Sequence, residues 1–271
     1  MSANSPQDSK SSFIATYPCL KVTLGGGVSE GEDSVIKEER IALYLNGKKI
    51  LSTMSIPQEQ DAHAVGFLLS EGVIEDIKDI EDIAIADDGL SVRIQANINE
   101  DNLINLYKEK TLTSGCCVGV TGNFEGNIIQ KFISSQVRVP IGLIWQTLER
   151  FYHNNELFDK TGCVHKALLI EADSSVIAEG FDVGRHNAID KVVGRARMQG
   201  RGLSDAILFV SGRLSLEMVI KTAMHDIPIV VSRSATTQLA IQSAQKLGIT
   251  LVGFARDGRC NIYTHASRIL L

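Results

Sequence analysis

The sequence lacks any stretch that would carry the chain into or across a membrane. No run of apolar residues in its 271 residues approaches the roughly 20 that a transmembrane helix needs. Residues 1–8 also lack the basic and apolar regions of a signal peptide. We therefore expect a cytoplasmic protein with no membrane partner.

Cysteine is scarce, and its spacing excludes the usual cysteine frameworks. The five cysteines are an odd number, and no two of them have C-x-x-C spacing. This pattern fits neither a secreted disulfide scaffold nor a structural zinc site, so no metal ligand set is expected. The five cysteines are Cys19, Cys116, Cys117, Cys163 and Cys260. In the absence of any other signal, we expect Cys19, Cys163 and Cys260 to be structural.

Familiar catalytic signatures are missing as well. The chain contains no G-x-x-x-x-G-K-(S/T), no G-x-S-x-G and no H-E-x-x-H. The H-x-E and P-C-x-x-C pair that binds zinc in nucleotide deaminases is also absent, which excludes that deamination chemistry.

Charge and length set further limits on function and architecture. The net charge of -5 and the isoelectric point near 5.7 argue against a general nucleic-acid binder and against a polybasic membrane-surface protein. A chain of this length with 44% hydrophobic residues can bury a full core and should form two domains.

The first half has the pattern of an α+β domain, predicted to cover residues 13–110 after a disordered tail at 1–12. Asn46-Gly47 indicates a hairpin within 35–56, and a second strand pair is expected across 82–96. A helix should follow Pro57, with Glu71 on its solvent side and Gly72 ending it. A short charged helix at 100–110 would mark the boundary.

The second half, 111–271, alternates strands and helices. After a helix at 140–152 and a hairpin at 167–178, this order predicts a largely parallel sheet covered on both faces, an α/β arrangement. Ligands bind such sheets where strands end and helices begin. The expected helices are 186–197, 214–225 and 237–247, and the expected strands are 206–210, 229–231 and 250–254.

A glycine-rich loop at 113–122 carries two adjacent thiols, Cys116 and Cys117, without any carboxylate or aromatic residue. Glycines leave room for a large second reactant to approach the sulfur atoms. A thiol with a pKa of about 8.5 needs backbone N–H groups or a nearby cation to become a working thiolate at neutral pH. The alternative is that both cysteines are small buried hydrophobes.

Three turns, at 183–186, 210–214 and 254–259, each place glycine and arginine at the end of a strand. Glycine permits close approach of the backbone and the guanidinium group grips phosphate, so Arg185, Arg213 and Arg259 could seat a nucleotide diphosphate. Alternatively, each glycine makes a turn and each arginine is a solvated charge. His186 could handle protons or could serve the core, and it could pair locally with Asp190, as Arg213 could with Glu217.

With these motifs in view, the chain resembles the FdhD/NarQ family, the formate dehydrogenase accessory sulfurtransferases, over nearly all residues after the tail. Weaker matches lie around 65–72 and 161–165. The resemblance implies a cytidine-deaminase-like three-layer domain in the C-terminal half and a smaller α+β domain before it. The specific segments are FDVGRHNAIDK (181–191), SGR (211–213) with EM (217–218), GFARDGR (253–259) and NIYTH (261–265).

The resemblance also implies a function. Family members take sulfur as a persulfide from a cysteine desulfurase and pass it to the molybdenum of the bis-molybdopterin guanine dinucleotide cofactor, which makes formate dehydrogenase competent. The persulfide cysteine corresponds to Cys116, whereas the second family cysteine falls on Gly119, so a mechanism that needs C-x-x-C spacing is in doubt here. The segment that holds the guanine nucleotide part of the cofactor corresponds to Phe254, Ala255, Arg256, Asp257, Gly258 and Arg259.

Two other functions remain compatible with the residues. The chain could be a chaperone that binds the molybdenum cofactor without moving sulfur, or a redox switch with a disulfide between Cys116 and Cys117. Apolar residues scattered through the N-terminal half could also form the face of a homodimer.

Overall fold

The computed structural model describes residues 13–107, 131–153 and 155–271. Its N-terminal part is built on a four-stranded sheet of order β4-β3-β6-β5. The strands are β3 (Glu39–Leu45), β4 (Lys48–Ser55), β5 (Ile80–Ile85) and β6 (Ser91–Ala96). The helices are α1 (Gln60–Ser70), the 3-10 turn η2 (Ile77–Asp79) and α2 (Glu100–Asn105).

This sheet is folded as the Asn46-Gly47 signal predicts, because both residues adopt positive φ and connect β3 to β4 in antiparallel register. Alternate strand residues such as Leu43 and Ile94 point to one face and are buried. They pack against the apolar side of α1, where Val65 and Leu68 are fully buried. The N-terminal part therefore has its own core.

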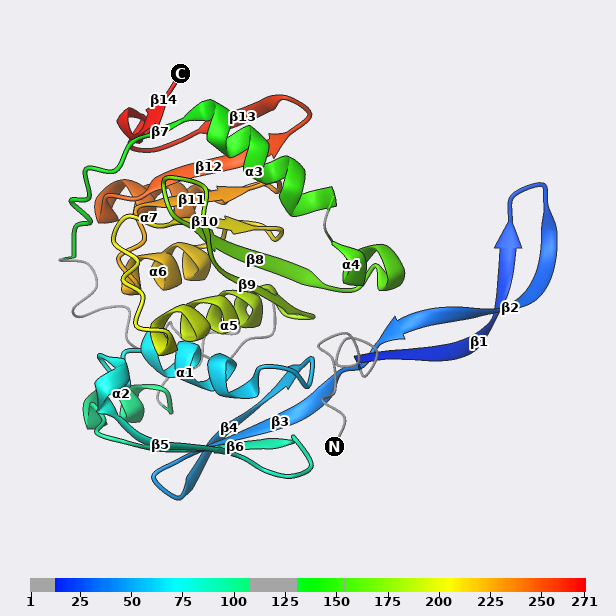
Figure 1. The fold of residues 1–271 in the computed structure, drawn as a ribbon, viewed down its shortest axis with the longest axis horizontal. Coiled ribbons are helices and arrows are strands. Elements are labelled where there is room, and N and C mark those ends of the chain that lie inside the picture. The colour runs from blue at the N-terminus through cyan, green and yellow to red at the C-terminus, as the bar shows by residue number, and fades with distance from the viewer. Residues whose placement is uncertain (1–12, 108–130, 154) are drawn as a thin grey trace, which may run out of the picture.

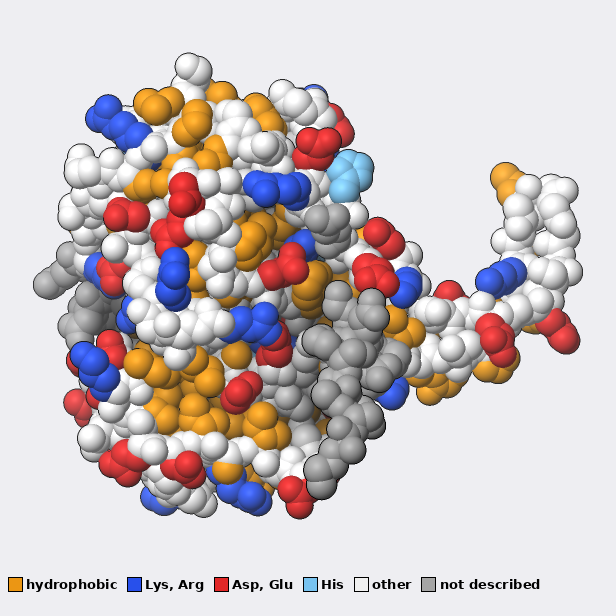
Figure 2. Space-filling view, in the orientation of Figure 1, with side chains coloured by type: hydrophobic (Ala, Val, Ile, Leu, Met, Phe, Trp, Pro, Cys, Tyr) orange, Lys and Arg blue, Asp and Glu red, His pale blue; other side chains and the backbone are white. Residues whose placement is uncertain are grey.

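A two-stranded ribbon precedes this unit and runs away from the body of the molecule (Figure 1). It consists of β1 (Ile14–Thr23) and β2 (Gly27–Ile36), paired antiparallel. Its outer half carries Leu20, Val22 and Val28 at 66–73% exposure, and Figure 2 shows it as a thin projection beside the main body. We call it the arm.

The C-terminal part is built on a six-stranded mixed sheet of order β13-β12-β11-β10-β8-β9. The strands are β8 (His165–Ile170), β9 (Val176–Asp182), β10 (Ile207–Val210), β11 (Ile229–Ser232), β12 (Thr250–Arg256) and β13 (Arg259–Ile262). The helices are α3 (Ile141–His153), α4 (Glu156–Thr161), α5 (Arg185–Met198), α6 (Leu216–Met224) and α7 (Gln238–Leu247), with the 3-10 turn η4 (Ala266–Arg268) near the end. Strands β7 (Val139–Pro140) and β14 (Ile269–Leu270) form a separate short pair.

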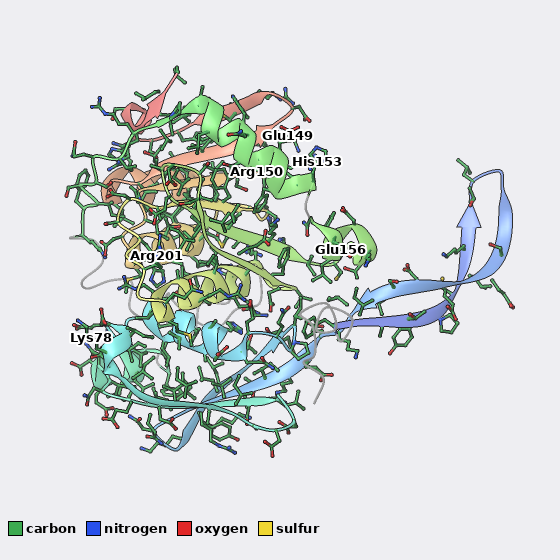
Figure 3. The ribbon with its side chains drawn as sticks, in the orientation of Figure 1. Lys78, Glu149, Arg150, His153, Glu156 and Arg201 are labelled. Atoms are coloured by element: carbon green, nitrogen blue, oxygen red, sulfur yellow. The ribbon has the colours of Figure 1, made fainter. Side chains whose placement is uncertain are left out.

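Helices cover both faces of this sheet, which makes three layers (Figure 1). On one face α5, α6 and α7 pack on alternate strand residues such as Leu208 and Val230. On the other face α3 packs on the intervening residues, such as Phe209 and Val231. The outer side of α3 carries charged residues, and Figure 3 labels Glu149 and Arg150 there. The predicted mixed α/β architecture is confirmed.

The two parts join where α1 crosses α5. An added Cβ at Gly66 would lie 1.9 Å from the carbonyl oxygen of Asp190, and one at Gly194 would lie 1.9 Å from that of Ala62, so the helix backbones touch. Below this crossing the carboxylate of Asp190 accepts hydrogen bonds from Lys221 Nζ at 2.7 and 2.9 Å. The joint is closely packed, buried and charged.

Several local expectations were wrong. Glu71 is 3% exposed, not on the solvent side, because the end of α1 is buried. The sheet is mixed: β10, β11 and β12 are parallel, whereas β8 pairs antiparallel with β10 and β9, and β13 pairs antiparallel with β12. Asp190 pairs with Lys221 and not with His186.

No helix in the described ranges is long and apolar enough to cross a membrane.

Candidate functional site

The strand directions bring four turns to one edge of the six-stranded sheet. Strands β9, β10, β11 and β12 run in the same direction, so their carboxyl ends lie together, next to the start of β8. The turns that follow these strands include all three glycine–arginine turns predicted to form a site. We call this side of the molecule the carboxyl edge. In open α/β sheets it is the usual place for a ligand.

A cavity of about 270 Å³ opens at the β12–β13 end of the carboxyl edge. Its lining residues are Phe254, Arg256, Arg259 and Asn261. The Arg256 guanidinium lies 6.0 Å from the centre of the Phe254 ring. An aromatic face beside two guanidinium groups can stack a planar base and bind phosphate oxygens.

Phe254 is held in an unusual backbone conformation. Its φ of 51° lies in the left-handed region, which a bulky side chain rarely adopts. The register between β12 and β13 shifts between Gly253 and Arg256, and a shift of this kind redirects a side chain. The N–H of Phe254 is fixed by the carbonyl oxygen of Ser234 at 3.0 Å. Strain of this sort concentrates at functional sites.

The predicted cofactor segment divides into two groups. Phe254, Arg256 and Arg259 line the cavity together. Ala255 is fully buried below it, and Asp257 and Gly258 form the turn with φ values of 53° and 72°. Three of the six residues can therefore contact a ligand through their side chains, and the others shape the backbone.

Arginine and serine residues continue the carboxyl edge from the cavity towards β10. Arg233, after β11, is exposed and lies 5.0 Å from the ring centre of Tyr152. Burial raises the pKa of Tyr152 to about 12, and nearby Arg233 opposes this shift. Ser234 Oγ donates to the Ser211 carbonyl oxygen at 3.0 Å, which ties the β11 turn to the β10 turn. Arg213 is exposed on this second turn.

Sequence analysis missed Arg233 and its neighbours because the turn Ser232-Arg233-Ser234 contains no glycine. The available signal was its position, directly after a buried apolar strand and before a helix. With Arg233 included, an exposed arginine lies at or just beyond the carboxyl end of each of the three parallel strands, namely Arg213, Arg233 and Arg256. Such a row attracts an anion larger than a single phosphate.

The far end of the carboxyl edge holds two histidines. His165 Nδ1 lies 3.1 Å from Ser211 Oγ. Burial and the charge of Arg185 lower its pKa, whereas Asp182 opposes the shift. His186 is 3% exposed, and burial, Lys221, Arg185 and His165 lower its pKa to about 3. Both rings are therefore neutral at physiological pH.

Asp182 fixes the turn that positions His186. It is fully buried at the end of β9 and accepts hydrogen bonds from Gly184 N at 2.9 Å and Asn187 Nδ2 at 2.8 Å. It also pairs with Lys191 Nζ at 2.7 Å and accepts from Ser55 Oγ at 2.5 Å. The start of α5 is thus held from both parts of the molecule.

The cysteines are only partly placed. Cys116 and Cys117 lie outside the described residues. Cys163 is exposed, so it does not serve the core, whereas Cys19 and Cys260 are partly buried. Burial raises the pKa of the Cys260 thiol. Among the described residues no group of three or more His, Cys, Asp or Glu side chains could hold a metal ion.

A mixed six-stranded sheet with helices on both faces and exposed arginines along its carboxyl edge defines the C-terminal part as a three-layer α/β fold. Comparison with known proteins makes this more specific. The model of the FdhD/NarQ family matches residues 36–270, so the chain belongs to the FdhD/NarQ family. The match begins at the base of the arm.

Several relatives span most of the chain. It is 58% identical over 243 residues to the sulfur carrier protein FdhD of Wolinella succinogenes, covering 89% of this chain and 84% of that protein. It is 34% identical over 261 residues to sulfur carrier protein FdhD of Listeria monocytogenes, covering 94% and 99%. The crystal structure of a putative formate dehydrogenase accessory protein from Desulfotalea psychrophila superposes with a TM-score of 0.76 at 26% identity, covering 95% and 100%.

Proposed function

We propose that this protein is a sulfur carrier that prepares the molybdenum cofactor for formate dehydrogenase. Cys116 takes sulfur from a cysteine desulfurase as a persulfide, and the outer sulfur then passes to the molybdenum of bis-molybdopterin guanine dinucleotide before the cofactor enters the dehydrogenase. In this second step the S–S bond of the persulfide breaks, and a thiol reductant supplies two electrons by forming a disulfide with Cys116, so that the outer sulfur leaves as sulfide. The names of the relatives support this role. The loading step conserves atoms: the Cys116 thiolate attacks the outer sulfur of the donor persulfide, a new S–S bond forms, and the donor leaves as a thiolate.

The observation that carries the proposal is the cavity with Phe254, Arg256 and Arg259 at the start of a row of exposed arginines. A guanine nucleotide needs a stacking surface for its base and cations for its phosphates, and this cavity offers both. In this proposal the cofactor is cargo that the edge holds by its nucleotide part.

GDP binding to the purified full-length chain tests the cofactor site. We expect saturable binding by isothermal titration calorimetry and at least about tenfold weaker binding for Arg259→Ala, the loss of one charge-assisted contact. Arg201→Ala is the matched control, because this arginine pairs with Glu171 away from the cavity. Absence of GDP binding, or equal affinity in Arg259→Ala, would reject the cofactor site.

Formate dehydrogenase activity in a strain that depends on this gene tests the sulfur step. Cys116→Ala should abolish activity, whereas Cys163→Ala, which removes an exposed thiol, should not. Mass spectrometry after incubation with desulfurase and cysteine should show one added sulfur on Cys116. Full activity of Cys116→Ala, combined with loss of activity in Arg259→Ala, would instead support a cofactor chaperone that moves no sulfur.

A further inference from the structure

The buried imidazole of His186 is a polar group that the fold leaves unexplained. His186 is the second residue of α5 and is 3% exposed. Its Nε2 atom has no hydrogen-bond partner in the described part of the chain. An unsatisfied buried polar atom lowers the stability of the folded chain, so native structures rarely keep one without a reason.

The His186 ring faces the carboxylate of Glu217 on α6. Its Oε2 lies 3.7 Å from His186 Nε2, which is too long for a direct hydrogen bond. Ser215 Oγ donates to the same oxygen at 3.0 Å and so holds the carboxylate in place. The Glu217 side chain is 12% exposed, whereas the His186 side chain is 4% exposed, so a ligand reaches the pair from the Glu217 side.

This spacing selects the kind of atom that can bridge the pair. A carboxylate only accepts hydrogen bonds, and a neutral imidazole with its proton on Nε2 donates one. The bridging atom must therefore accept from His186 and donate to Glu217. A hydroxyl or amino group meets both conditions, whereas a phosphate oxygen or a thiolate has no proton for the carboxylate.

Two helix N-termini surround the pair. Helix α5 begins after Gly184, which has no capping side chain, and Ser215 before α6 bonds to Glu217 instead of capping the helix. The first-turn N–H groups of both helices therefore lack a side-chain cap, and they favour a polar ligand. The side chain of Arg185 passes over Gly212, whose added Cβ would lie 2.9 Å from Arg185 Cδ.

Hydrogen bonds run along the carboxyl edge from the cavity to His165. Phe254 N donates to the Ser234 carbonyl, Ser234 Oγ donates to the Ser211 carbonyl, and Ser211 Oγ lies 3.1 Å from His165 Nδ1. Strands β10 and β12 are separated by β11 alone, so their ends lie two strand spacings apart, about 10 Å. An extended nucleoside diphosphate spans such a distance.

We propose that His186 and Glu217 form a subsite for one protic group of the nucleotide that the cavity holds. The group is a ribose hydroxyl, which accepts from Nε2 and donates to Oε2, because the guanine base itself stacks on Phe254 in the cavity. This inference rests on the proposed function, which supplies the nucleotide. It assigns His186 and Glu217 to ligand recognition and not to support of the fold.

Nuclear magnetic resonance of the full-length chain with ¹⁵N-labelled histidine tests the contact. Saturating GDP should shift the His186 Nε2 resonance. The matched control is His225, equally buried at the other end of α6 and bonded to Ser70, which should not shift. The analogue 2′,3′-dideoxy-GDP, which lacks the ribose hydroxyls, should fail to shift His186, whereas inosine diphosphate, which lacks only the amine, should shift it as GDP does.

Substitution gives an independent readout. Glu217→Gln should weaken GDP binding about tenfold, because a buried charge-assisted hydrogen bond is worth about 1.4 kcal/mol or more. Glu149→Gln, an exposed carboxylate on α3, should bind GDP as the parent does. Unchanged affinity in Glu217→Gln with an unmoved His186 resonance, while Arg259→Ala weakens binding, overturns the subsite and leaves the cofactor site intact. Failure of the parent protein to bind GDP overturns both.

Discussion

Two buried polar clusters in the described part of the chain differ in how completely their hydrogen bonds are satisfied. In the interface cluster, Asp190 is bonded by Lys221 and Ser70, and Asp182 is bonded by Lys191 and Ser55. In the edge pair, His186 and Glu217 face each other at 3.7 Å and His186 Nε2 has no hydrogen-bond partner among the described residues. A satisfied cluster stabilises the joint between two parts of a protein, whereas an unsatisfied one has capacity for a ligand.

The largest effect should come from the helix crossing above the interface cluster. Gly194→Ala places a Cβ 1.9 Å from the backbone oxygen of Ala62, so α1 and α5 must separate. We expect a loss of about 5 kcal/mol in the free energy of unfolding, measured with urea. Gly202→Ala is the control, because nothing lies within 4 Å of its added Cβ. A Gly194→Ala protein as stable as the Gly202→Ala protein would contradict the contact.

Removing one charge from the interface cluster should come next. Lys221→Met leaves the Asp190 carboxylate 2% exposed without its cation, which costs about 3–5 kcal/mol. Combining it with Asp190→Leu should recover part of that loss, since no uncompensated charge then remains buried. Urea unfolding of the single and double variants measures both values, and a double variant less stable than Lys221→Met would argue against a coupled pair.

Acid should destabilise the protein partly through the edge pair. The pKa of His186 is about 3 in the folded chain and near 6.5 when unfolded, so between these values the unfolded chain binds more protons. The contribution of neutral His186 to the free energy of unfolding is complete above pH 6.5. It falls by about 1.4 kcal/mol for each pH unit below that value. His186→Gln should therefore reduce the stability lost between pH 6.5 and pH 5 by about 2 kcal/mol. Urea unfolding at pH 6.5 and at pH 5 measures the loss of stability in parent and variant. Equal losses would mean that His186 does not stay neutral in the folded chain.

The smallest expected effect on stability comes from a change that can be made in both clusters, the replacement of a carboxylate by its amide. This comparison separates the two clusters most directly. Glu217→Gln keeps a group that can accept from Ser215, and we expect its unfolding free energy to change by less than about 1 kcal/mol. Asp190→Asn leaves the ammonium of Lys221 beside a neutral amide, and we expect a loss of more than about 2 kcal/mol. Similar losses in both variants, compared by thermal unfolding, would remove the distinction between joint and ligand site.

Local patterns in the sequence predict much of the architecture. Asn46-Gly47 places the β3–β4 hairpin, and the alternation of strands and helices after His165 gives the order of the second half. These predictions succeed because turn chemistry and apolar strands act over a few residues. Three residues of the predicted cofactor segment, Phe254, Arg256 and Arg259, line the cavity, and their binding of the cofactor stays a prediction.

Features that depend on distant contacts could not be predicted in this way. The burial of Glu71 and the Asp190–Lys221 pair arise only when α1, α5 and α6 meet. The arm was missed because its strands have no core to face, so pairs such as Leu20 with Glu30 mix apolar and acidic residues on one side. The role of Cys116 stays a prediction, since that residue lies outside the described ranges.

The left-handed backbone at Phe254 has a thermodynamic consequence of its own. Holding a phenylalanine there costs about 1–3 kcal/mol, which a glycine would avoid. That cost is met when the chain folds, not when a molecule arrives. For a planar ligand the aromatic ring is therefore already oriented before binding. Association then loses little conformational entropy in ordering the Phe254 side chain.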